Sequence, residues 1–540
     1  MQRRALLRRG VTVPLALTVP HSAAATPRSR VSRSSVPASR ASDDSTDPDG
    51  YEPLGRVPVE GAAEAVVGDD GEVAYVAATT GFATVDIGDP ADPTVLASEH
   101  DISVDGAPLL EILDLKVDGD LLIVPGPANR ASSDLFHGFA RYDVSDPAEP
   151  QLIGEPYETG DHIHNCFLQD EILYVVINGR DENPLVVFDV GGDEPEEIGR
   201  WSLLEHEPGW RDVDWLARYL HDVYVHDGIA YLAHWNAGTY LLDVSDPTDP
   251  TYVSRVTDTD LEEQLEMDDD EEARLGLPGN DHYAAVDETG DLLGVGREAW
   301  ATGGDEPDGP GGIDLYDVSD STDPELRATI EPPRAADERY YGPLWTTAHN
   351  FELRDGELYA SWYQGGVTIH DVSDPAAPDE VASWRDPETS GFWTARVSEP
   401  GAIFVASSTQ AIPHGLTEGA LYTFPIRAGE QVDQPSLTDL EELDLGDEDA
   451  ETSDPTTDDG NTGSGDDSGS DADAPIDGGG APIESTDGDD GNATGTGSES
   501  DPIPGFSVAG TAVGVAGGIA SLEWLRRHRS ADESNGQRES

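Results

Sequence analysis

The chain has 540 residues, and 30 Lys and Arg against 110 Asp and Glu give it a formal net charge of −80 at pH 7. So negative a molecule repels a phosphate backbone, which excludes nucleic-acid binding through general electrostatics. Self-repulsion of this size destabilises a compact fold in dilute buffer, whereas concentrated salt screens it. The composition is therefore typical of a protein from an extreme halophile.

The hydrophobic content is low but sufficient for a folded core. It amounts to 36% of the residues and includes 17 Tyr, 10 Trp and 10 Phe, which is enough for one sizeable domain or two small ones. Because Cys166 is the only cysteine, no intramolecular disulfide stabilises the fold.

The first 25 residues are predicted to be a secretory signal peptide, with a basic start, a short apolar run and an Ala-rich end. Arg3 and Arg4 begin a segment that resembles the twin-arginine signal, which implies export of an already folded protein. An ordinary basic signal is the alternative. Residues 26–50 are expected to form a disordered linker.

Residues 431–500 contain 22 acidic residues and no basic ones among many Gly, Ser, Thr and Pro. Such a composition cannot bury enough apolar surface to fold, so this segment is predicted to be a disordered tether. It leads into residues 501–529 and a short tail at 530–540.

Residues 501–529 combine the tripeptide Pro504-Gly505-Phe506, an apolar stretch of about 20 residues and a basic cluster at 526–529. This order resembles the PGF-CTERM sorting signal of archaeal surface proteins, which implies cleavage by an archaeosortase and attachment of a lipid. A permanent transmembrane anchor is the alternative. Both predict a protein held at its C-terminus on the extracellular face of the cell membrane.

Residues 51–430 contain a repeat in which a hydrophobic strand ends in Asp and a turn of the form SDPxxP follows. Six copies end their strands at Asp86, Asp143, Asp189, Asp243, Asp317 and Asp371. A hairpin precedes each copy and another strand follows it, giving four strands per unit. Because such units bury both faces only when they pack around an axis, the repeat predicts a β-propeller.

The repeat resembles the LVIVD family, through segments such as PLVVFDV and GTYLLDV, over roughly residues 55–427. Residues 392–427 supply three further strands, and Pro53–Val57 resembles the missing fourth. The predicted fold class is therefore all-β, a seven-bladed propeller of four-stranded antiparallel blades closed by its N-terminal strand. Six blades are the alternative.

Three insertions interrupt the repeat, at 205–218, 258–280 and 302–312, and are expected to lie outside the core strands on a binding face. The acidic run 268–272 lacks the spaced ligands of a dedicated calcium loop, so a solvated surface is the simpler interpretation. Several tryptophans could line a sugar or partner surface, although packing between blades is their commoner role. These are Trp210, Trp215, Trp345, Trp362 and Trp393.

A histidine recurs near the start of the first strand in four successive units. His164, His221 and His349 each precede a tyrosine by ten residues, and His282 precedes Leu293 by eleven. The remaining units have Glu64 or a neighbour, Ile112 or Leu113, and Trp393 or Thr394 at this place.

Because the first strand of each blade lines the central channel, these four imidazoles are expected to converge on the axis. Neutral imidazoles suit Zn, Fe or Cu, so we predict a transition-metal site there. Asn165, Asp222 and Asn350 are candidates to orient the rings, and His162 and Cys166 are expected to share the strand face of His164. Structural histidines copied by duplication are the alternative.

No GxSxG, HExxH, P-loop or paired CxxC motif is present in the sequence. The first functional hypothesis is therefore a monomeric surface module that binds a protein, a glycan or a small ligand. The second is a metal-dependent enzyme, of oxidase or lyase type, with the four histidines around the axis. A similar set of four histidines binds iron in carotenoid-cleaving oxygenases, and that likeness is limited to the expected fold.

Overall fold

The computed structural model describes residues 50–130, 132–179, 182–267, 274–304, 307–398, 402–410, 412 and 416–445, which all belong to one structural unit. The predicted signal peptide, the PGF motif, the apolar segment, most of the tether and the acidic run 268–272 lie outside these residues. Within the described part of the chain, no helix is long and apolar enough to cross a membrane.

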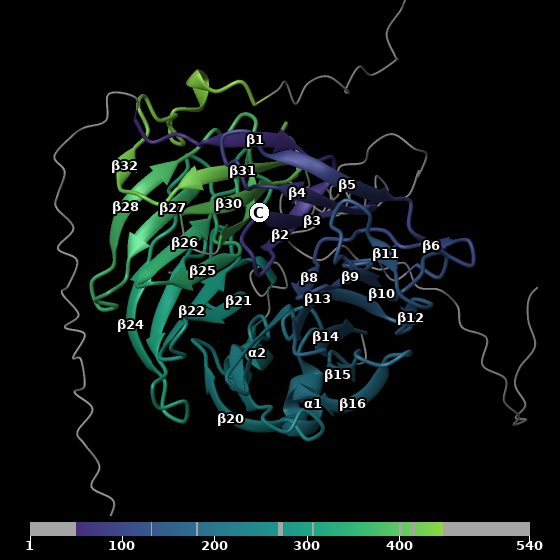
Figure 1. Cartoon of the computed structure of the whole chain (residues 1–540). Coiled ribbons are helices and arrows are strands. Elements are labelled where there is room, and N and C mark those ends of the chain that lie inside the picture. Colours follow the sequence, from purple (N-terminus) through teal and green to yellow (C-terminus); the bar gives the residue numbers. More distant parts are fainter. Residues whose placement is uncertain are drawn as a thin grey trace, which may run out of the picture. The chain divides into compact units, whose positions relative to one another are not determined.

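Seven four-stranded antiparallel sheets follow one another along the chain as the blades of a propeller (Figure 1). The first blade is β2 (Ala62–Val67), β3 (Val73–Ala78), β4 (Gly81–Asp86) and β5 (Thr94–His100). The second is β8 (Lys116–Asp118), β9 (Leu121–Gly126), β10 (Gly138–Asp143) and β11 (Gln151–Leu152), with β12 (Tyr157–Glu158) also on β10. The third is β13 (His162–Gln169), β14 (Ile172–Asn178), β15 (Leu185–Asp189) and β16 (Glu196–Trp201).

The fourth blade is β17 (Asp222–His226), β18 (Ile229–Ala233), β19 (Thr239–Asp243) and β20 (Thr251–Val256). The fifth is β21 (Asp281–Val286), β22 (Leu292–Arg297), β23 (Ile313–Asp317) and β24 (Glu325–Ile330). The sixth is β25 (Phe351–Arg354), β26 (Glu357–Ser361), β27 (Val367–Asp371) and β28 (Asp379–Trp384), extended by β32 (Gly429–Glu430). First strands such as β2, β13 and β21 lie toward the middle, and last strands such as β16, β20 and β24 lie at the periphery (Figure 1).

The seventh blade joins both ends of the propeller. It consists of β29 (Phe392–Val397), β30 (Ile403–Ser408) and β31 (Ala420–Pro425), and β1 (Gly55–Pro58) completes it. β1 runs antiparallel to β31, with Gly55 opposite Thr423. The predicted closure by the N-terminal strand is confirmed, and the six-bladed alternative is wrong. Closure covers the sheet edges that the first and last blades would otherwise expose.

The Asp that ends the third strand of a blade makes the turn that follows it. In four blades its carboxylate accepts the backbone N–H of the serine two residues later, as Asp243 does from Ser245 at 3.0 Å. Such a side-chain turn stops the strand and leads into the proline-containing loop. This local chemistry explains why the SDPxxP sequence recurs in the chain.

A β-bulge interrupts the first strand of four blades near its start. The register shifts between Ala62 and Ala65, Ile163 and Cys166, Asp281 and Tyr283, and Phe392 and Thr394. Bulges redirect side chains, and His164, His282 and Trp393 all lie inside one. The bulge also breaks the alternation assumed for Cys166, which packs with Ile163 in an apolar cluster and not on the face of His164.

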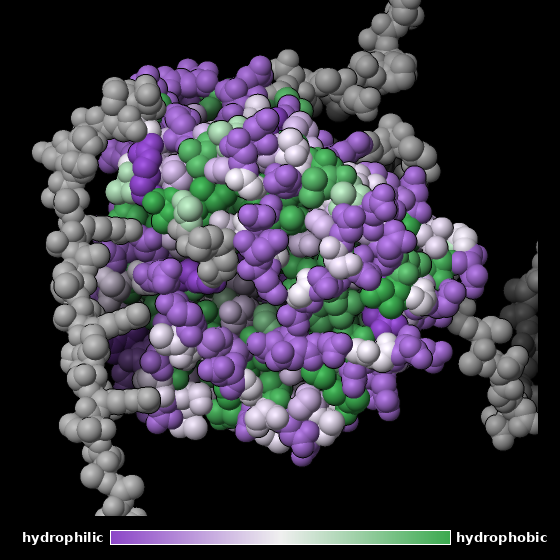
Figure 2. All heavy atoms as spheres, viewed as in Figure 1, coloured by the Kyte–Doolittle hydropathy of each residue, from purple (hydrophilic) through white to green (hydrophobic). Residues whose placement is uncertain are grey.

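Two of the three insertions form short helices outside the blade strands, as α1 (Leu203–His206) and η1 (Pro208–Asp212) in the first and α2 (Leu261–Glu266) in the second. The described residues of the third, 302–304 and 307–312, form neither helix nor strand. The remaining short elements are β6 (Ser103–Val104), β7 (Ala107–Pro108) and η2 (Leu440–Glu442). Four of the five highlighted tryptophans, Trp210, Trp345, Trp362 and Trp393, are buried in packing contacts. Hydrophilic residues cover much of the face seen in Figure 2, in keeping with the acidic composition.

Candidate metal centre

The four recurring histidines form a continuous row of imidazoles from four successive blades. Ring centroids are 4.0 Å apart between His164 and His221, 3.9 Å between His221 and His282, and 4.5 Å between His282 and His349. All four rings are buried. The structure therefore brings the four predicted residues together as neighbours in a row.

One cavity contacts the whole row. It measures about 240 Å³ including its open side. Its walls are Glu64, Leu113, Asp114, His164, Asn165, His221, Asp222, His282, His349, Asn350 and Trp393. Leu113 and Trp393 thus hold the places that the sequence left undecided in the second and seventh blades. The site has imidazoles on one arc of the axis and carboxylates, amides and apolar groups around the rest.

Backbone carbonyls fix the orientation of three of the rings. His221 Nδ1 lies 3.0 Å from the carbonyl oxygen of His282, His164 Nδ1 lies 3.4 Å from that of Ala128, and His349 Nδ1 bonds that of Trp393. Because a carbonyl only accepts, Nδ1 must donate, which leaves the Nε2 lone pair of each ring as the ligand atom. A metal-binding histidine usually has such a hydrogen bond on its other nitrogen.

Burial keeps the row uncharged. It lowers the pKa of His164 and of His349 to about 3, and it lowers the pKa values of His221 and His282 well below their usual range. The other imidazoles add to the effect at His221 and His282 because a second positive charge would lie too close. Neutral imidazole is the form that coordinates a metal ion.

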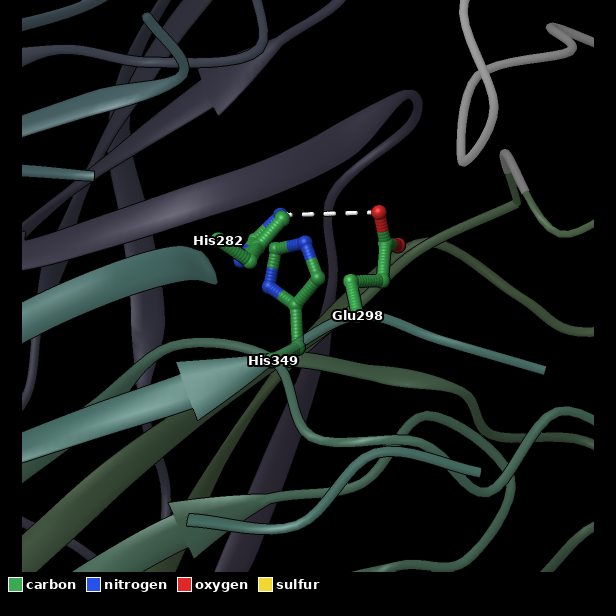
Figure 3. A group of neighbouring side chains, drawn as sticks. All are labelled: His282, Glu298 and His349. Atoms are coloured by element: carbon green, nitrogen blue, oxygen red, sulfur yellow. Dashed lines mark ion pairs between the residues drawn. The ribbon is translucent and has the colours of Figure 1, made fainter. Parts of the chain in front are cut away.

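Glu298, which sequence reasoning missed, joins the row at one end. It follows β22 directly, and its carboxylate faces His282 with 3.7 Å between Oε2 and Nε2. In the described part of the chain, His282, Glu298 and His349 are the one set of three ligand-type side chains whose atoms all lie within 4.8 Å of one another. Figure 3 shows the three side chains pointing toward one another. His164 and His221 lie further along the row.

The carboxylates and amides next to the row pair with each other. The amides of Asn165 and Asn350, predicted to orient the rings, instead donate to Asp222 at 2.5 Å and to Glu64 at 2.6 Å. Asp114 pairs with Lys116 and accepts the backbone N–H of Cys166. The only lysine of the chain, Lys116, therefore balances the charge of one of the carboxylates in the cavity wall.

Aromatic side chains surround the row on its other side. Trp393 and Tyr363 lie against His349, with ring centroids 4.2 and 4.8 Å away, and Trp235 lies 5.2 Å from His221. Tyr219 contacts His164, and its hydroxyl lies 3.2 Å from Nε2 of His162. This layer excludes water from the rings, which strengthens any electrostatic or coordinate interaction there.

Comparison with protein families identifies LVIVD repeats at residues 67–99, 217–258 and 358–386. No curated protein matches the chain by sequence. Three solved structures to which the chain is similar share 9–12% sequence identity with it.

The propeller domain of Cps50 (Swd1) from Myceliophteria thermophila has 9% identity and a TM-score of 0.46, and the match covers 69% of this chain and 99% of that one. A hypothetical selenium-binding protein from Sulfolobus tokodaii has 12% identity and a TM-score of 0.43, over 67% and 92%. The designed protein Ika8 has 10% identity and a TM-score of 0.39, over 69% and 100%. On its repeats and its own sheet topology, the chain is a seven-bladed β-propeller that carries LVIVD repeats.

Proposed function

We propose that the protein is a metal-dependent enzyme whose propeller axis binds a transition-metal ion (Zn, Fe or Cu) through His164, His221, His282 and His349. The observation that carries the proposal is the buried, neutral row of imidazoles. Among the described residues, Nε2 of His349 and both ring nitrogens of His282 have no hydrogen-bond partner. Burying a polar atom without a partner costs about 1–3 kcal/mol, and a bound metal ion would offset that cost.

The spacing of the rings supports coordination. Two imidazoles that bind one ion at about 2.0–2.1 Å have ring centroids roughly 4.5–5 Å apart at the usual ligand angles. The observed separations of 3.9 to 4.5 Å require only a small outward movement of the rings. The fit is best for His282 and His349, whose ligand atoms also lie within 4.8 Å of a carboxylate oxygen of Glu298.

The size of the cavity limits the substrate. The 240 Å³ of the cavity includes open solvent, and its closed part is about the size of one water molecule. We therefore expect the substrate to present one reactive group at the opening of the cavity, because the closed part is too small for a molecule of several heavy atoms. Oxidation or lyase-type bond cleavage at the metal is the reaction class we propose.

The second candidate is an interaction module in an exported protein held on the outer face of the membrane by its C-terminus. The twin-arginine-like start, the acidic tether and the PGF motif in the sequence support this location. LVIVD repeats in a propeller suit binding of a surface protein, a glycan or a small ligand by a monomer. The two candidates are compatible, because the metal would lie inside the blades and a partner would bind their loops.

Metal analysis of the full chain, exported by its native route and purified in concentrated salt, tests the proposal. We expect close to one transition-metal ion per chain by mass spectrometry, and loss of that metal in a His282→Ala/His349→Ala double variant. The matched control is His226→Ala, which removes a half-buried histidine on β17 outside the row. Wild-type protein without metal, even after incubation with Zn²⁺, Fe²⁺ or Cu²⁺, would overturn the proposal and leave the interaction module.

A further inference from the structure

We infer that Glu298 is a metal ligand, and that with His282 and His349 it forms a two-histidine, one-carboxylate site suited to iron(II). The inference rests on the proposed metal centre and specifies its ligands. It replaces the four-histidine ligand set of that proposal: the ion lies at one end of the histidine row, and His164 and His221 are not ligands.

The distance between Glu298 and His282 fits two ligands of one ion. Oε2 and Nε2 are 3.7 Å apart, which is too long for a hydrogen bond. Two atoms that each bind one ion at about 2.0–2.2 Å lie roughly 3 Å apart at a right angle and 4 Å apart when nearly opposite. The observed separation falls within this range, so the distance is compatible with one ion bound by both atoms.

The burial of Glu298 also requires a partner. The residue is 0% exposed, and in the described part of the chain its Oε2 has no hydrogen-bond partner. The other oxygen, Oε1, accepts the hydroxyl of Tyr363. Tyr363 therefore acts as a positioning residue: it occupies one oxygen and leaves the second directed at the histidines.

The donor set indicates the class of metal. Imidazole alone suits Zn, Cu, Ni and Fe, whereas two histidines and one carboxylate with open positions are typical of non-heme iron(II) sites. Three protein ligands leave positions free for water or a small substrate. The cavity beside His282 and His349 has closed space for about one water-sized ligand, and Glu298 is not part of its walls.

The test is cobalt(II) titration of the full chain without oxygen, with the visible absorption bands reporting the number of ligands. We expect Glu298→Gln to weaken cobalt(II) binding by more than about 100-fold, beyond the 10–100-fold typical of residues that only support a ligand. The bands should change because one oxygen ligand is lost. Glu298→Asp, which withdraws the carboxylate by one methylene, should also weaken cobalt(II) binding. This variant replaces Glu298→Gln in the titration if the glutamine variant does not fold.

A matched control exists in the sixth blade. Glu357 is likewise a buried glutamate that accepts a tyrosine hydroxyl, 2.7 Å from Tyr359, but unlike Glu298 it does not belong to the group of ligand-type side chains around His282 and His349. Glu357→Gln and Tyr359→Phe should leave cobalt(II) binding unchanged. Tyr363→Phe should weaken binding about 10–100-fold and shift the bands, which a purely structural tyrosine would not do.

The outcomes separate this inference from the proposed metal centre. If Glu298→Gln binds cobalt(II) with wild-type bands, Glu298 is not a ligand, whereas loss of metal in His282→Ala/His349→Ala still supports the centre. If the affinity for cobalt(II) falls but the absorption bands still indicate the same number of ligands, Glu298 only orients His282 and the inference is overturned. Absence of binding in the wild-type chain would overturn both proposals.

Discussion

The propeller axis is lined by two groups of blades, a histidine arc and an apolar arc, which share a backbone arrangement but carry different side chains. The third to sixth blades contribute the four imidazoles, whereas the seventh and second blades contribute Trp393 and Leu113 at the equivalent place. The bulge occurs on both arcs, in β13 and β21 with histidines and in β2 and β29 without them. The backbone therefore does not require histidine, and the imidazoles are best explained by the chemistry they provide.

This comparison weakens the alternative of histidines copied for structural reasons. A residue needed to close the axis would be needed in every blade, yet Leu113 closes it with carbon atoms alone and is 3% exposed. An apolar residue packs there without an unsatisfied nitrogen, which makes it the better choice for stability. The histidine arc gives up that advantage over four consecutive blades.

The largest change in the free energy of unfolding is expected for a substitution on the apolar arc. Trp393→Ala removes a buried ring that packs on His349 and should lower the free energy of unfolding by about 3–5 kcal/mol. Denaturant unfolding in concentrated salt measures it, and a loss below about 1 kcal/mol would contradict the structural role given to this arc.

The next effect belongs to the histidine arc. Metal at a hundred times its dissociation constant should raise the free energy of unfolding by about 2.7 kcal/mol, because it binds the folded chain only. Leu113→Ala should show this increase on a lower baseline, and His282→Ala/His349→Ala should not show it. Equal responses of the two variants to metal would remove the functional distinction between the arcs.

Much of this division could be predicted from the sequence, because both arcs belong to a repeat. The Asp-terminated strands locate the blades, and aligning them places His164, His221, His282 and His349 at one position. The closing strand was also predictable, since residues near Gly55 resemble the other exit strands. These predictions depend on local patterns that recur.

The parts that the sequence did not reveal depend on single positions. Glu298 follows a strand in only one blade, and in a chain with 110 acidic residues one more carboxylate carries no signal. The bulge at His164 shifts the register, so spacing alone placed Cys166 on the wrong face. The partners of Asn165 and Asn350 are side chains from other blades, which only the closed ring brings within reach.

The smallest predicted effect is a difference between the two arcs in how the free energy of unfolding depends on pH. The pKa of His164 is about 3 in the folded chain against 6.5 when solvated, so folding excludes a proton that the unfolded chain binds. The resulting stability is complete above about pH 6.5 and is lost as the pH falls toward 3. In metal-free protein between pH 5 and 6, His164 should contribute a slope of about 1.3 kcal/mol per pH unit.

Replacing one residue on each arc isolates that contribution. His164→Gln should reduce the measured slope by about 1.3 kcal/mol per pH unit, and Leu113→Ala should lower stability without changing the slope. Buried acids such as Asp281, whose pKa burial raises to about 6, titrate in the same range but are common to all three proteins and cancel in the difference. An unchanged slope in His164→Gln would mean that this imidazole binds a proton equally in the folded and unfolded chains. The neutral row would then begin at His221.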